Sequence, residues 1–271
     1  MSEQLSDIRS DNVRGEARNI VAKIFAGAMV FTTASEAAEI PKDTPWAKGY
    51  DLMLDDVRTK PYEVAGIVVN RDGKYTWQNW NTAKDAGISG ITAPRQQTIE
   101  ALQNPDLSDV CVIHAHNEIE PNQSRAPSAP PGFRDSVIVV RTTAELPQIL
   151  SRKEKLDGLR WGVVDGLGFW SLQVKWLNGQ QYRNRKEVLD EMVTNISRYV
   201  LANERAVQWK NNVSNMTAGS DTFQRLDDKA KVNYLKNSND YKVLVEAFRN
   251  VNILLSYKSH DDAKKDIPCK P

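Results

Sequence analysis

Residues 61–80 read PYEVAGIVVNRDGKYTWQNW, and this stretch decides the fold class. A nearly continuous β-branched run at 64–69 is followed by the turn sequence Asn70-Arg71-Asp72-Gly73, and an aromatic-rich run follows at 74–80. β-Branched and aromatic residues favour strands, and Asp-Gly between two such runs is typical of a hairpin turn. The sequence therefore predicts a β-hairpin here.

Further strands and helices alternate along the chain on either side of this hairpin. The predicted strands cover 110–116, 136–141 and a second hairpin at 161–174. The predicted helices cover 38–55, which Pro41 and Pro45 break, and 95–103, 143–151, 188–200 and 243–255. A long proline-rich loop is predicted at 117–134. The sequence thus predicts an α+β domain at 19–178, a mobile N-terminal tail at 1–18 and a helical C-terminal region at 179–271.

The composition is that of a globular protein and gives no reason to expect a nucleic-acid partner. The chain has 271 residues, 40% of them hydrophobic, and its net charge is +1 because 36 basic residues face 35 acidic ones. Binding of phosphates needs a surplus of cations on one face. The two cysteines lack the spacing of zinc ligands, so zinc ribbons and disulfide-rich scaffolds are excluded, and Cys111 is expected to be an inert core thiol.

The N-terminal part bears on localisation. No run approaches the 18 or more apolar residues of a membrane span, and the longest candidate is 24–34. Basic residues precede it, and Ser35-Glu36-Ala37 resembles a leader cleavage site, so 24–37 is either a signal peptide or a short strand entering a helix. A cytoplasmic or secreted protein is favoured, and a periplasmic one if the segment is a signal peptide.

The sharpest chemical feature is a histidine pair, His114 and His116. Residues two apart on a strand share one face, so both imidazoles can reach one ion; the alternative is one histidine at the edge of the core and one in solvent. The third histidine is His260, so carboxylates must complete any metal site. Amidohydrolase-like barrels need more histidines, and nucleobase deaminases need a downstream Pro-Cys-x-x-Cys, so both classes are excluded.

The segment 61–73, followed by the His-Ala-His segment some fifty residues after Glu63, resembles JAB/MPN (JAMM-motif) metallopeptidase-like domains. The likeness is greatest to the JAB-like domains of bacterial toxin and effector proteins. It extends in separate pieces over residues 30–175. It implies a cytidine-deaminase-like mixed β-sheet flanked by helices, here with a helical C-terminal extension.

The resemblance also implies a function, the zinc-dependent hydrolysis of an amide or isopeptide bond in a protein or peptide. His114, His116 and Asp135 would bind Zn²⁺, and Glu63 would take a proton from a water whose pKa zinc lowers to about 7. Glu63 would afterwards protonate the leaving amine. The candidates nearest to the family's oxyanion-binding serine are Ser124 and Ser128.

The motif departs from the family pattern at two positions. Pro127 stands where the family's aspartate commonly lies, which requires an enlarged loop if Asp135 takes that role. Gly132 stands where the family has its serine, three residues before the aspartate. Two alternatives to the hydrolase therefore stay open. One is a catalytically inactive JAB/MPN-like protein-interaction module, and the other is a different metal-binding protein that uses the histidine pair.

Overall fold

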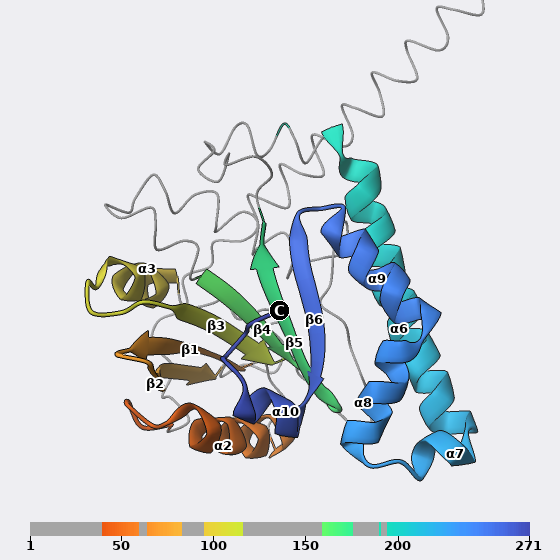
Figure 1. Ribbon diagram of the computed structural model, residues 1–271, viewed down its shortest axis with the longest axis horizontal. Coiled ribbons are helices and arrows are strands. Elements are labelled where there is room, and N and C mark those ends of the chain that lie inside the picture. Colours follow the sequence, from red (N-terminus) through yellow and green to blue (C-terminus); the bar gives the residue numbers. More distant parts are fainter. Residues whose placement is uncertain (1–39, 60–63, 83–94, 116–158, 176–189, 191–193) are drawn as a thin grey trace, which may run out of the picture.

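The computed structural model describes residues 40–59, 64–82, 95–115, 159–175, 190 and 194–271. Within these residues six strands form one mixed sheet with helices on both faces (Figure 1), so the predicted α+β class is confirmed. The strands are β1 (Val64–Arg71), β2 (Lys74–Thr82), β3 (Val110–Ala115), β4 (Leu159–Val164), β5 (Gly168–Val174) and β6 (Ile253–Ser259). The helices are α2 (Trp46–Thr59), α3 (Arg95–Gln103), α6 (Ile196–Gly219), α7 (Asp221–Gln224), α8 (Asp228–Asn237), α9 (Asn239–Arg249) and α10 (His260–Lys265).

The strand order is β2-β1-β3-β4-β5-β6, and every neighbouring pair is antiparallel except β3 and β4, which are parallel. Both predicted hairpins, β1-β2 and β4-β5, are confirmed. The first one turns at Asp72 and Gly73, whose φ angles of 51° and 79° belong to a type I′ turn. The side chain of Asn70 supports this turn by accepting a hydrogen bond from the Gly73 amide at 2.9 Å.

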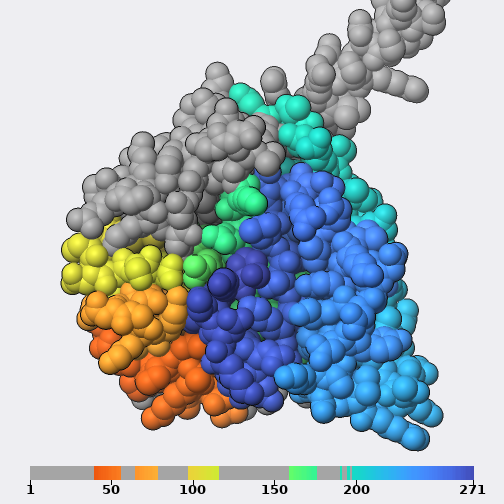
Figure 2. Space-filling model, viewed as in Figure 1, coloured from red at the N-terminus to blue at the C-terminus, as the bar shows by residue number. Residues whose placement is uncertain are grey.

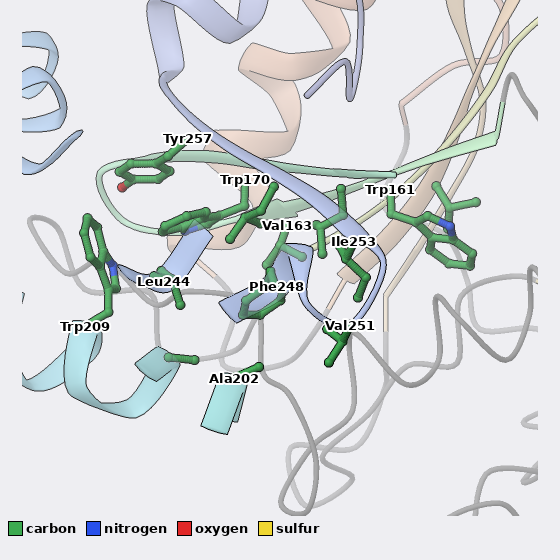
Figure 3. Close-up of a cluster of buried hydrophobic side chains, with 14 of the residues drawn as sticks. Trp161, Val163, Trp170, Ala202, Trp209, Leu244, Phe248, Val251, Ile253 and Tyr257 are labelled. Carbon is green, nitrogen blue, oxygen red and sulfur yellow. The ribbon is translucent and has the colours of Figure 1, made fainter. Parts of the chain in front are cut away.

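The larger hydrophobic core lies between the sheet and α3, α6, α8 and α9. Aromatic side chains from β5, β6 and α6 lie next to one another in this core (Figure 3). The ring of Trp170 stacks on Tyr257 with centroids 4.1 Å apart, and the ring of Trp209 contacts Trp170 edge to face at 5.4 Å. All three rings are fully buried. This burial fixes the position of the helical C-terminal part on the sheet.

A second core covers the opposite face, under α2 and α10, which lie side by side in Figure 1. The predicted helix at 38–55 begins only at Trp46, because Pro45 fixes the backbone before it; the Pro45 carbonyl then accepts the helical hydrogen bond of the Gly49 amide at 3.0 Å. Trp46 stacks on Trp77 of β2 with centroids 5.5 Å apart. A Cβ at position 49 would clash with the Trp77 indole, so glycine permits this close approach.

The prediction of a helix at 243–255 is wrong for its second half. Helix α9 ends at Arg249, Asn252 takes a left-handed conformation with φ of 61°, and β6 begins at Ile253. Burial along β6 alternates strictly, with Ile253, Leu255 and Tyr257 inside. This period of two defines a strand with one buried face. The C-terminal region therefore contributes an edge strand to the sheet and is not only helical.

Cys111 is not the inert core thiol that the sequence predicts. It forms a disulfide with Cys269, 158 residues away, and their Cα atoms are 5.9 Å apart. The bond fastens the C-terminal segment to β3, in the middle of the sheet. Figure 2 shows this dark blue segment between the orange residues of α2 to β2 and the lighter blue helices. Sequence spacing could not reveal the pairing, because the fold alone brings the two residues together.

Several predicted features lie outside the described residues. They are the tail at 1–18, the segment 24–37, the loop at 117–134, the strand at 136–141, the helix at 143–151 and most of 188–195. In the part of the chain that the structure describes, no helix is both long and apolar enough to cross a membrane.

Candidate functional site

His114 lies near the C-terminal end of β3. The β-branched residues that precede it favour a strand conformation. Four residues before it are buried, and His114 itself is half-buried. Val110 and Val112 face the larger core, whereas Cys111 and Ile113 face the second one. Because side chains alternate along a strand, His114 points to the side of the larger core.

The pairing of β1 with β3 gathers strand ends from distant parts of the sequence. The two strands are antiparallel, with Val64 opposite Ala115 and Ala65 opposite His114. The N-terminal end of β1 therefore lies beside the C-terminal end of β3. On the other side β4 runs parallel to β3, with Val164 beside Ala115. The start of β1 and the ends of β3 and β4 thus lie together at one edge of the sheet, the edge formed by strand ends.

Of the predicted site residues, only His114 belongs to the described part of the chain. The other predicted positions lie outside it: Glu63, His116, Ser124, Ser128 and Asp135. Glu63 directly precedes β1, and His116 directly follows β3. No group of three or more histidine, cysteine or acidic side chains that could hold a metal occurs among the residues with described positions.

Sequence reasoning missed the role of Asp165, which follows β4 at the same edge of the sheet. It is a buried carboxylate, 2% exposed. Its Oδ1 accepts hydrogen bonds from the Leu167 and Gly168 amides at 2.9 and 2.7 Å and from Tyr257 Oη at 2.9 Å, and its Oδ2 accepts one from Trp170 Nε1 at 2.9 Å. Buried charges need such partners. The Asp-Gly-Leu-Gly sequence predicted the turn, but no residue near it in the sequence indicates the hydrogen bond from the distant Tyr257.

A surface pocket of about 250 Å³ opens where α2, α8 and α10 meet. Lys264 on its wall bridges Asp51 of α2 and Asp261 of α10 at 3.1 Å each. The hydrogen bond to Asp51, followed by the one to Asp261, raises the pKa of Lys264. His260 in the same wall is 6% exposed, and its Nδ1 lies 2.9 Å from Tyr50 Oη. These contacts hold the helices together on the second core.

No family model, curated protein or solved structure matches this chain. The features of this chain that bear on its function are the sheet register, the half-buried His114 and the residues that flank β1 and β3. Glu63, which precedes β1, is a carboxylate and His116, which follows β3, is an imidazole, and both side-chain types occur in hydrolytic metal sites.

Proposed function

We propose that this chain is a zinc-dependent hydrolase of amide or isopeptide bonds, built on a JAB/MPN-like fold and acting as a bacterial effector or toxin. The observation that supports it is the antiparallel register of β1 and β3, in which Ala65 lies opposite His114. The chain enters β1 directly from Glu63 and leaves β3 directly into His116. The register brings the start of β1 and the end of β3 together at one edge of the sheet, which supports the proposal because the motif needs the residues next to these strand ends to meet.

The alternation of side chains supports the same proposal. Ile67 and Val69 of β1 face the larger core, as do Val110 and Val112 of β3. His114 has the parity of these β3 residues. In the proposed site the same alternation would continue by one step before Ala65 and after His114, which would put Glu63 and His116 on the face of His114.

In the proposed site His114, His116 and Asp135 would hold the zinc ion. Two imidazoles and a carboxylate with a fourth position left for water are the donor set of a catalytic zinc. When bound, zinc would lower the pKa of its water to about 7 and polarise the substrate carbonyl. Glu63 would accept the proton of the attacking water and pass it to the leaving amine. Ser124 or Ser128 would donate to the oxyanion.

The second candidate is a catalytically inactive module of the same fold that binds a protein partner. The sequence at Pro127 and Gly132 favours it, because these positions lack the aspartate and the serine of the active family pattern. The two candidates differ in one measurable property. The hydrolase needs one bound zinc, whereas the module needs none.

Elemental analysis of the purified full chain after zinc loading and buffer exchange tests the proposal. We expect about one zinc per chain in the wild type and in Glu63→Gln, because Glu63 acts on the water and is not a ligand. His114→Ala, His116→Ala and Asp135→Ala should each lose the metal. Asp106→Ala is the matched control, since Asp106 is exposed in the turn between α3 and β3, and it should bind as much zinc as the wild type.

Circular dichroism shows which variants keep the fold, and only these enter the comparison. A wild type without zinc after loading would overturn the hydrolase and leave the interaction module. Zinc that persists in folded His114→Ala would also overturn it, because the one described ligand would then play no part. With zinc present, cleavage of isopeptide-linked model substrates by the wild type and its loss in Glu63→Gln would support the full proposal.

A further inference from the structure

The C-terminal segment is held on the sheet by a covalent bond and by an ion-paired lysine. Cys269 and Cys111 form the disulfide, and both residues are buried, at 1% and 3% exposure. Nearby, Lys258 Nζ of β6 donates to Asp266 Oδ2 at 2.7 Å and to the Lys270 carbonyl at 2.6 Å. In Figure 1 the C-terminus accordingly lies over the sheet. The chain end is thus fixed to an edge strand and to a central strand.

The structure around the disulfide is shaped to hold it. Cys269 has φ of 55°, a left-handed conformation that residues with a side chain rarely adopt. Gly162 of β4 lies beneath it, and a Cβ there would come within 2.8 Å of Cys269 Sγ and would also clash with the Phe169 ring. The absence of a side chain at 162 leaves the space that the sulfur occupies. The bond therefore belongs to the buried second core.

The strand that carries the disulfide also carries His114. Cys111 faces the second core, and His114, three residues later, points to the opposite face. The chain has only two cysteines, and this bond uses both. Disulfides persist in oxidising compartments, whereas the cytosol of most cells keeps thiols reduced. The state of this bond therefore depends on where the protein folds.

We propose that this protein matures in an oxidising compartment, where formation of the Cys111–Cys269 bond locks the C-terminal segment onto the strand of His114. In that reaction two thiols lose two protons and two electrons and become one disulfide. The electrons and protons pass to a disulfide of a thiol oxidant, which is released as two thiols. The leader-like pattern at 24–37 agrees with this proposal, which does not depend on the metal site.

Thiol counting tests where the bond forms. The full chain is produced once with export to a bacterial periplasm and once in a reducing cytosol, then denatured without reductant and titrated with a thiol reagent. We expect no reactive thiol in the exported protein and two per chain after reduction. Two free thiols per chain in the exported, folded protein would overturn the proposal. Since no metal or activity is measured, the result is separate from that of the zinc experiment.

Thermal unfolding with and without reductant tests whether the bond is a lock. Because it closes a loop of 158 residues, we expect reduction to lower the unfolding midpoint of the exported protein by about 10 °C or more. The matched control is the double variant Cys111→Ala, Cys269→Ala. Adding reductant should not change its unfolding midpoint. If the double variant does not fold, the comparison of wild-type unfolding with and without reductant decides alone. If the oxidised and the reduced wild type had the same unfolding midpoint, the proposal that the bond locks the C-terminal segment would be overturned.

Discussion

Replacing Asp165 by asparagine should destabilise the protein by about 2–4 kcal/mol. The carboxylate is 2% exposed and accepts four hydrogen bonds, from the Leu167 and Gly168 amides, Trp170 Nε1 and Tyr257 Oη. Three elements depend on it, since Tyr257 belongs to β6, Trp170 to β5, and Asp165 itself follows β4. It therefore joins the hairpin to the edge strand.

The magnitude follows from the two oxygens taken separately. Oδ1 accepts three of the four bonds, and asparagine can keep these with its own carbonyl oxygen. Its amide group then faces the indole N–H of Trp170, so one buried donor loses its acceptor, at about 1–3 kcal/mol. The other three bonds lose their charged acceptor, which adds about 1 kcal/mol. Total stabilities of about 5–15 kcal/mol make this a large loss.

The assay is urea unfolding followed by circular dichroism. Tyr234→Phe is the control, because Tyr234 is 55% exposed and its replacement should change the free energy of unfolding by less than about 0.5 kcal/mol. In a Trp170→Phe background the cost of Asp165→Asn should fall by about 1 kcal/mol or more, since the unsatisfied donor is gone. A cost of Asp165→Asn as small as that of the control would refute the reasoning.

Two further predictions concern single contacts. Gly162→Ala should lower stability by about 1–3 kcal/mol in thermal or urea unfolding, because its Cβ would press on the Phe169 ring and on Cys269 Sγ; a neutral result would show that the core there yields easily. Burial raises the pKa of Tyr241 above its ordinary 10.0, so the folded state favours the neutral phenol. That contribution is present below pH 10 and is lost as the pH rises through the raised pKa; unfolding free energies measured from pH 9 to 12 should fall less steeply for Tyr241→Phe than for the wild type.

The hairpins could be predicted because the signals for them are local. Asp72 and Gly73 adopt the positive φ angles that their residue types favour, and the β-branched residues beside them form the strands. Strand β6 could not be assigned with the same ease, because its apolar residues directly continue a helical pattern. Only the turn at Asn252 and the alternation after it separate the two. The distinction depends on pairing with β5, which no short window contains.

The candidate site shows the same division between local and distant signals. The sequence alone indicated that His114 ends an apolar strand, and the structure confirms that strand. The sequence alone could not show that Ala65 lies opposite His114, because that pairing depends on the order of strands in the sheet. The disulfide of Cys111 and the hydrogen bond from Tyr257 to Asp165 likewise join residues far apart in sequence. Such contacts are consequences of the topology.

The topology also narrows the choice of the third ligand in the proposed zinc site. Asp165 and His114 lie at the ends of parallel neighbouring strands and on the same face, which makes Asp165 the described carboxylate best placed to join the site. Both of its oxygens already accept hydrogen bonds from buried donors, and binding a metal would break at least part of this network. The ligand should therefore come from another segment, as proposed for Asp135. We expect folded Asp165→Asn to bind as much zinc as the wild type and Asp135→Ala to bind none. Elemental analysis showing the reverse would move the third ligand to Asp165.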